Sequence, residues 1–365
     1  MQIPIARPSL GPEEAEAVNA VLASGIIAEG PITRSFEYEF ATYCGAAHAV
    51  AVNNGTAALH AALLAAGVGP GDEVIVPAFT FFATASSVSM TGAKPVFADV
   101  LRDTCCIDPD SVYDRITEKT KAIIGVHLYG QPCDAFLLRE ICSDRGLIFI
   151  EDVAQAHGAE INGAKVGSIG DLACFSFYAT KNMATGEGGM VTTGSAELHN
   201  RLRRIINHGQ SEKYIHTEIG YNYRMTDIAA AIGRVQLSKL DEFIRVRQEN
   251  AAYFNEHIGV HGIITPVVAP GRSHVWHQYV IRVTDDAPLS REGLMAYYLK
   301  EKGIGSAIHY PIPLHRQPVF TLIGSERGIT CPVADELAET VLSLPVHPGV
   351  GAAERQYIVD SLNKL

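Results

Sequence analysis

Short apolar runs alternate with helical patterns over the first two-thirds of the chain. We interpret the runs as buried parallel strands, because they are apolar on both faces. They lie at 48–52, 73–76, 95–99, 121–126 and 147–151. The segments between them predict helices, for example at 56–66 and 133–144. This alternation favours an α/β fold with a largely parallel sheet.

Two helices are predicted before the first strand. Pro12 in a first turn and Gly25 after the last apolar residue indicate the ends of the first helix. For the second helix, Thr33 is the predicted N-cap and Gly45 the stop signal.

The pattern changes in the last third of the chain. Segment 226–257 contains no proline and predicts a helix with a possible break near Leu240. A smaller α+β domain is expected beyond it, from a strand-like run and three helical segments. These lie at 278–284, 290–302, 333–343 and 353–362. Because 365 residues exceed what one core usually serves, we predict a large domain at 1–250 and a small one at 251–365.

Composition and charge exclude several classes of protein. With 47% hydrophobic and 19% charged residues, the chain is typical of a soluble globular protein. A net charge of −11 provides no basic face, so neither nucleic acid nor an anionic membrane is an expected partner. No secretory leader is apparent, and no run approaches the roughly 18 apolar residues of a membrane span. We therefore expect a cytoplasmic protein.

Cysteine and histidine spacing indicates neither a disulfide framework nor a metal site. The seven cysteines include no C-x-x-C motif. Two histidine pairs, His257 with His261 and His274 with His277, have no accompanying acidic or cysteine cluster.

The first candidate for chemistry is the helix start that follows the run at 48–52. Free N–H groups and the helix dipole at Gly55, Thr56 and Ala57 suit a phosphate, and Gly55 allows a ligand close to the backbone. A helix start capped by threonine is the alternative. The motif is not G-x-G-x-x-G, which disfavours a dinucleotide-dependent oxidoreductase.

Two later strand ends carry an acid and a lysine. Asp152 follows a buried run, and ligands of doubly wound sheets bind outside the carboxyl ends of strands. Such a carboxylate can keep a pyridinium nitrogen protonated, although it could instead cap the next helix. Lys181 follows another strand, and a desolvated lysine is a nucleophile towards aldehydes, although a lone lysine is usually solvated. The helix start that suits a phosphate, the acid and the lysine follow one another in the order of a pyridoxal phosphate (PLP) site. This order predicts a Schiff base at Lys181.

Motifs along nearly the whole chain resemble those of the DegT/DnrJ/EryC1/StrS family of sugar aminotransferases, which have the aspartate aminotransferase fold. They are A-E-G-P at 28–31, N-G-T-A-A-L at 54–59, G-D-E-V at 71–74, E-D-V-A-Q-A-H-G at 151–158, S-F at 176–177, K-N at 181–182, H-Y-P at 309–311 and P-L-H at 313–315. The resemblance implies a large PLP-binding domain with a mostly parallel mixed sheet flanked by helices, and a smaller C-terminal α+β domain.

The resemblance also implies roles for individual residues. Lys181 would form the internal aldimine and shuttle a proton, and Asp152 would pair with the pyridine nitrogen. The rest of the cofactor would be held by Gln155 at the ring hydroxyl, Phe81 on the ring face, and Ser176 with the backbone of Gly55, Thr56 and Ala57 at the phosphate. His157 lies either near the cofactor or in the core.

Members of this family are usually homodimers with shared active sites. Asn222 matches the asparagine that reaches the phosphate in the partner subunit, although Gln155 and Asn222 could each simply satisfy a turn. His309 and Tyr310 lie in a stretch that either approaches the substrate or forms a structural loop.

The reaction implied is a ping-pong transfer of an amino group from L-glutamate to a nucleotide-linked keto sugar. The stretch 24–31 favours C4 of a 4-keto-6-deoxy sugar over C3. Lysine at position 181 argues against the dehydratase branch, which has histidine there. A C3-keto sugar, a keto-cyclitol acceptor, or a regulatory protein without turnover remain alternatives.

Overall fold

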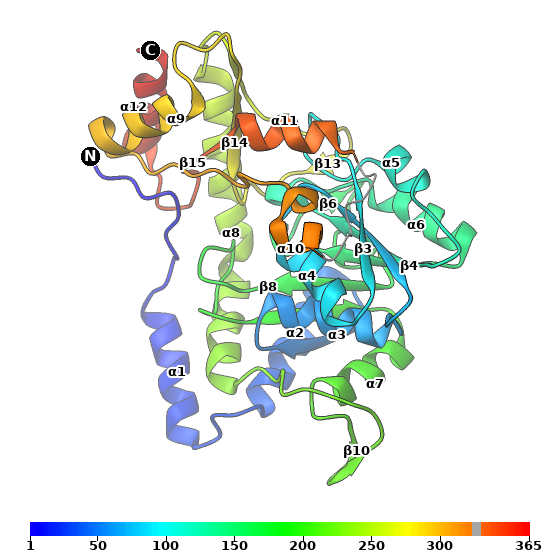
Figure 1. The fold of residues 1–365 in the computed structure, drawn as a ribbon. Coiled ribbons are helices and arrows are strands. Elements are labelled where there is room, and N and C mark those ends of the chain that lie inside the picture. The colour runs from blue at the N-terminus through cyan, green and yellow to red at the C-terminus, as the bar shows by residue number, and fades with distance from the viewer. Residues whose placement is uncertain (323–329) are drawn as a thin grey trace.

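A central seven-stranded sheet organises the protein in the computed structural model, which describes residues 1–322 and 330–365 (Figure 1). The strand order is β1-β9-β8-β5-β4-β2-β3. These strands are β1 (His48–Val52), β2 (Glu73–Pro77), β3 (Lys94–Ala98), β4 (Thr120–Val126), β5 (Ile148–Asp152), β8 (Leu172–Ser176) and β9 (Gly189–Thr193). All ladders from β3 to β8 are parallel, which confirms the mostly parallel mixed sheet.

The β9 strand was not predicted, and it is antiparallel to both of its neighbours. β1 runs in the same direction as the other strands, but it pairs with β9, so the parallel pairing expected for 48–52 is wrong. A run that is buried on both faces has the same composition in either kind of ladder, and composition therefore does not give the direction of its neighbour.

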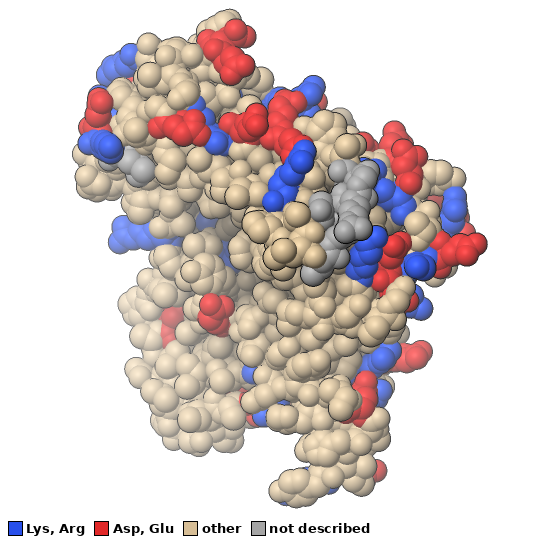
Figure 2. Space-filling model, in the orientation of Figure 1, with Lys and Arg blue, Asp and Glu red and all other residues tan. Residues whose placement is uncertain are grey.

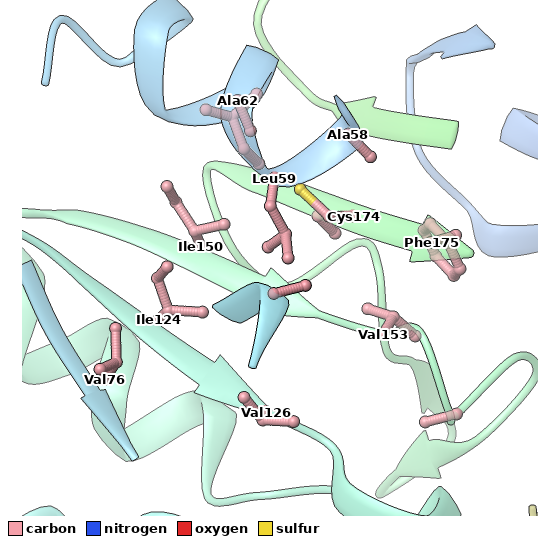
Figure 3. Close-up of a cluster of buried hydrophobic side chains, with 14 of the residues drawn as sticks. Ala58, Leu59, Ala62, Val76, Ile124, Val126, Ile150, Val153, Cys174 and Phe175 are labelled. Atoms are coloured by element: carbon pink, nitrogen blue, oxygen red, sulfur yellow. The ribbon is translucent and has the colours of Figure 1, made fainter. Parts of the chain in front are cut away.

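Helices pack against the sheet. α3 lies against β8 and β9, and α6 lies against β4 and β5. Figure 3 shows the side chains of α3, including Ala58, Leu59 and Ala62, beside those of Ile150 and Cys174 in the strands. The small alanines allow the helix to lie close to the sheet. The helices are α1 (Pro12–Ser24), α2 (Pro31–Cys44), α3 (Gly55–Ala65), α4 (Ala83–Met90), α5 (Pro109–Tyr113), α6 (Ala135–Arg145), α7 (Ala196–Ile205), α8 (Asp227–His257), α9 (Arg291–Ala296), α10 (Pro318–Leu322), α11 (Pro332–Thr340) and α12 (Ala352–Asn363).

The start of α2 differs from the prediction. Gly30, not Thr33, is the N-cap, and Pro31 is the first helical residue. The capping carboxylate comes from α8: Asp227 accepts hydrogen bonds from the backbone N–H groups of Gly30, Ile32 and Thr33. The Thr33 hydroxyl also donates to Asp227, at 2.6 Å. A distant side chain therefore replaces the local cap.

α8 is one continuous helix of 31 residues, so the predicted break near Leu240 is wrong. It runs along the height of the molecule in Figure 1, packing on α1 and α2 and also on α12. Leu240 and Ile244 belong to the larger hydrophobic core, and Ala251 and Phe254 belong to a second one. The change in pattern reflects a change of neighbours along a single helix.

The last third of the chain has a separate three-stranded sheet. Its members are β12 (Ile263–Ile264), β14 (Tyr279–Val283) and β15 (Val341–Leu344). β15 corrects the predicted helix at 333–343, because α11 ends at Thr340 and the following residues pair with β14. α9 continues as a π-helical turn to Lys302. The second hydrophobic core lies here, and we propose it as the core of a domain that begins near residue 251.

Short strands complete the fold: β6 (Glu160–Ile161), β7 (Ala164–Lys165), β10 (Gln210–Glu212), β11 (Ile215–His216) and β13 (Arg272–Ser273). The hairpin of β10 and β11 extends away from the body of the molecule (Figure 1). All seven cysteines are free and buried. In the part of the chain that the structure describes, no helix is long and apolar enough to cross a membrane.

Candidate active site

The carboxyl ends of β1, β2, β5 and β8 meet at one edge of the sheet, because these strands run in the same direction. Gly55 and Phe81 follow β1 and β2, and Asp152 and Ser176 end β5 and β8. Lys181 lies in the loop after β8. The strand direction thus explains how residues far apart in sequence reach one edge.

Lys181 has the properties of a nucleophilic amine. Its side chain is partly exposed, and burial of the amine lowers its pKa from 10.5 to about 8, although the negative charge of Asp152 opposes this shift. Among the described residues, none accepts a hydrogen bond from the amine. The lowered pKa gives Lys181 a larger neutral fraction near neutral pH than an ordinary lysine has, and the neutral amine is the form that attacks an aldehyde.

Asp152 is the buried carboxylate of the site, with 5% of its surface exposed. Burial raises its pKa, while the Ala154 N–H and the Thr84 hydroxyl, which donate to it at 3.1 and 2.9 Å, lower the pKa. Both hydrogen bonds orient the carboxylate and leave lone pairs for a further donor.

The neighbouring Glu151 serves another purpose, because alternation along β5 turns it away from Asp152. Its carboxylate accepts hydrogen bonds from the N–H groups of Gly167, Ile169 and Gly170, and contacts His127 at 3.0 Å. Glu151 therefore holds the loop before β8, and Asp152 alone is available to a ligand.

Gln155 joins two parts of the chain. Its Oε1 accepts a hydrogen bond from the Tyr129 N–H at 2.7 Å, and its Nε2 donates to the Tyr310 hydroxyl at 3.0 Å. The ring of Tyr310 lies 5.9 Å from that of Phe81, which is 56% exposed. His309 is turned towards the smaller sheet instead, where its Nδ1 contacts the Ser343 hydroxyl at 2.9 Å. Of the two predicted substrate residues, only Tyr310 contacts a predicted cofactor residue through its side chain.

Gly55 and Ser176 form the predicted phosphate cradle. A Cβ atom added at Gly55 would lie 2.7 Å from the Ser176 Cβ, so only glycine fits without a shift. The Ala57 N–H already donates to the Asn54 side chain at 2.8 Å. Within the described residues, the Gly55 and Thr56 N–H groups have no acceptor and are available to an anion.

His157 and Asn222 lie in contrasting environments. His157 is buried against the rings of Phe175 and Phe177, and burial lowers its pKa to about 3, with a smaller contribution from the charge of Lys181. It is therefore a neutral core histidine close to the site. Asn222 is exposed and pairs through its backbone with Asn207, so the fold of one chain does not join it to the other candidates.

Comparison with known proteins decides the family. The model of the DegT/DnrJ/EryC1/StrS aminotransferase family matches residues 8–363. The chain belongs to this family. It is therefore a PLP-dependent aminotransferase of the aspartate aminotransferase fold.

Several relatives of this aminotransferase are similar over nearly their whole length. The pleiotropic regulatory protein of Geobacillus stearothermophilus is 44% identical over 358 residues, 97% of this chain and 94% of the relative. The dTDP-3-amino-3,4,6-trideoxy-alpha-D-glucose transaminase of Streptomyces venezuelae is 40% identical, covering 95% and 90%. The PLP form of the putative sugar aminotransferase Spr1654 from Streptococcus pneumoniae superposes with a TM-score of 0.92 at 30% identity, covering 100% and 98%.

The geometry of this aminotransferase fits its cofactor. A nucleophilic amine, a buried carboxylate and a glycine cradle match the aldehyde, the ring nitrogen and the phosphate of PLP. We propose that Lys181, Asp152, Gln155, Phe81, Ser176, Gly55 and Thr56 hold it.

Gly55→Ala is expected to weaken PLP binding by about tenfold or more, because the added methyl group displaces Ser176 from the phosphate cradle. Titration of the cofactor-free protein with PLP measures this. Gly69→Ala is the matched control, since a Cβ there meets no atom within 4 Å. Equal affinities of the two variants for PLP would argue against the cradle.

The lowered pKa of Lys181 predicts a pH dependence in the cofactor-free protein. Below about pH 8 the amine is mostly protonated and only its neutral fraction reacts, so its acylation rate should rise through a midpoint near 8. Competitive labelling followed by peptide mass spectrometry reports the rate for Lys181 alone. A midpoint close to the ordinary lysine value of 10.5 would show that the amine is not desolvated.

Three residues that support the site, Thr84, Asn182 and His277, were given no role in it by the sequence analysis. Thr84 donates to Asp152. Asn182 follows Lys181, and its Oδ1 lies 3.3 Å from Nδ1 of His277. The K-N motif at 181–182 was a signal for Asn182. No local signal marks Thr84 or His277. Their contacts with Asp152 and Asn182 span 68 and 95 residues of sequence.

Proposed function

We propose that this aminotransferase transfers an amino group from L-glutamate to a nucleotide-linked keto sugar. The observation that carries the chemistry is the Lys181 amine, whose pKa is lowered to about 8, near the buried carboxylate of Asp152. The printed name of the Streptomyces venezuelae relative, a transaminase of a dTDP sugar, supports the class of acceptor.

Each residue of the site has a defined task in this proposal. When bound, PLP supplies an aldehyde and an electron-withdrawing ring. Lys181 would bind the aldehyde carbon, and its free amine would move a proton at the amino-bearing carbon of the substrate. Asp152 would hold a proton on the ring nitrogen. Gln155 would hydrogen-bond the hydroxyl group of the PLP ring and so orient the ring. Phe81 and Tyr310 cover the ring and exclude water.

The position of amination is the finer part of the proposal. The stretch 24–31 favours C4 of a 4-keto-6-deoxy sugar, whereas the printed name of the Streptomyces venezuelae relative, at 40% identity, favours C3. Within one chain this stretch contacts Asp227 and Arg203, through Gly30 and Glu29. If it selects the acceptor, it acts at the site of a second subunit.

Incubation of the purified protein with L-glutamate and a panel of acceptors tests this function. The panel holds 3-keto and 4-keto nucleotide sugars and keto-cyclitols, and 2-oxoglutarate release reports turnover. Release with a 4-keto-6-deoxy sugar is expected. Release with a 3-keto sugar alone would overturn the position, and release with a cyclitol alone would overturn the sugar class.

We further propose a cytoplasmic homodimer. Figure 2 shows that charged side chains gather on the upper and right-hand parts of this face, whereas the lower part, over α1, α2 and the β10 hairpin, has few. Large apolar side chains are exposed in these segments and in the residues next to them, as at an interface. They are Leu22, Ile26, Ile27, Tyr38, Tyr214, Ile215 and Ile219.

Subunit mixing tests whether Asn222 acts across that interface. Lys181→Ala and Asn222→Ala homodimers should both be impaired. A mixed dimer of the two contains one site with both wild-type residues and should regain activity. Failure to regain it, when mixed dimers are shown to form, would place Asn222 in its own subunit's site, and an unimpaired Asn222→Ala homodimer would place it outside any site.

The alternative of a regulatory protein without turnover, which the printed name of the Geobacillus relative would suit, is disfavoured by membership of an aminotransferase family. The acceptor panel distinguishes it: such a protein would bind PLP and release no 2-oxoglutarate with any acceptor.

A further inference from the structure

Arg247 is a buried cation in the middle of α8, with 4% of its surface exposed. In the described part of the chain no carboxylate pairs with it, and burial lowers the pKa of its guanidinium to about 9. Its Nη1 instead donates to the carbonyl oxygens of Trp276 and His277, at 3.0 and 3.2 Å. Burying a guanidinium without a carboxylate is costly, so these two carbonyl contacts call for an explanation.

The segment that Arg247 holds, residues 275–278, has an unusual backbone. Trp276 has φ of 49°, in the left-handed region that a bulky residue rarely adopts. Its ring stacks on that of His274, with centroids 3.8 Å apart. Such a conformation persists only where surrounding contacts fix it, and the two hydrogen bonds from Arg247 are among those contacts.

This segment reaches the proposed cofactor site by one route through Asn182. The Asn182 side chain donates to the Val275 carbonyl at 3.0 Å, and its Oδ1 lies 3.3 Å from Nδ1 of His277. Asn182 directly follows Lys181 in the chain. The position of segment 275–278 therefore sets the position of the loop that carries the lysine.

A second route leads through Tyr129 to Gln155. The Val275 N–H donates to the Gly130 carbonyl at 3.0 Å, and the Gln278 N–H donates to the Tyr129 carbonyl at 3.2 Å. The backbone of Gly130 lies very close to segment 275–278, since a Cβ at Gly130 would lie 2.9 Å from the Trp276 nitrogen. Tyr129 in turn donates its N–H to Gln155. The same segment thus positions both ends of the site.

We propose that Arg247 is a positioning residue of the PLP site, which fixes segment 275–278 and through it both Lys181 and Gln155. This inference rests on the proposed assignment of those two residues to the cofactor. Arg247 itself touches neither substrate nor cofactor. Its contribution is geometric, and small displacements of groups that hold a reacting molecule have large effects on binding and rate.

The test compares Arg247→Met and Arg247→Lys with wild type, using PLP titration of the cofactor-free proteins. Methionine keeps the volume without donors, and we expect it to weaken PLP binding by about 10- to 100-fold. Lysine keeps a donor without the planar fork and should give an intermediate affinity. Arg245→Met is the matched control, because Arg245 is exposed on the same helix and pairs only with Glu242 and Glu249 among the described residues.

The outcomes separate this inference from the proposed function. Wild-type protein that fails to bind PLP would overturn both. Wild-type affinity in Arg247→Met, with normal binding by wild type, would overturn only the role of Arg247. If Arg247→Met does not fold, Arg247→Lys decides, since an affinity equal to that of wild type overturns the inference and a lower affinity in a folded protein supports it.

Discussion

Lys181→Ala is expected to lower kcat for transamination by about a thousandfold or more while leaving the protein folded. The substitution removes both the amine that binds the aldehyde and the group that moves the proton at the substrate carbon. Its cost to stability should be small, because the Lys181 amine makes no hydrogen bond to any described residue. Release of 2-oxoglutarate and the thermal unfolding midpoint measure the two effects.

Lys94→Ala is the control for this variant. Lys94 is half-exposed and forms an ion pair with Glu73 at 3.5 Å, away from the proposed site, so its loss should leave kcat unchanged. A Lys181→Ala protein that turned over at the rate of Lys94→Ala would contradict the assignment of the reactive lysine.

Asp152→Asn is the second large effect, with an expected fall in kcat of about 10²- to 10³-fold. Asparagine has the same shape: its one carbonyl oxygen can accept from the Ala154 N–H, while its amide NH₂ can donate to the Thr84 hydroxyl oxygen in place of the bond that Asp152 accepts. It carries no negative charge, however, and cannot hold a proton on the ring nitrogen. Steady-state kinetics with saturating PLP isolate this electronic effect from cofactor binding.

Asp171→Asn provides the comparison for Asp152→Asn. Asp171 also accepts a backbone N–H, from Phe149 at 2.8 Å, but at the opposite end of β5. Its replacement should affect stability and leave kcat alone. If Asp152→Asn retained the activity of Asp171→Asn, the carboxylate at the strand end would have no electronic role.

The sequence predicts those parts of the site that depend on strand ends. Asp152 could be found because ligands bind at the carboxyl ends of parallel strands, whereas Ser176, at another strand end, was indicated by the family resemblance. Gly55 and Thr56 could be found because a helix start after a strand has free N–H groups. These features depend on short segments, so the residue types within each segment are enough to predict them.

Features that depend on distant partners could not be predicted in this way. Thr33 has the residue type of an N-cap, but the cap is Asp227, 194 residues away. Residues 341–343 continue a helical pattern, but pairing with β14 makes them a strand. Near Leu240 the pattern shifts because α8 passes from one core to the other.

The same limit applies to the supports of the site. Neither Thr84 nor Arg247 lies in a motif that the sequence analysis used, and each acts through contacts that only the folded chain creates. The sequence left Tyr310 either near the substrate or in a structural loop, and its hydrogen bond to Gln155 adds a link to the cofactor residues that spacing alone does not show.

The most direct test of the central assignment is reduction of the PLP-bound protein with borohydride, followed by peptide mass spectrometry. Reduction fixes the cofactor covalently to the lysine that carries it. The account predicts a phosphopyridoxyl group on Lys181 and on no other lysine. Modification of a different lysine, or none in a protein that binds PLP, would contradict it.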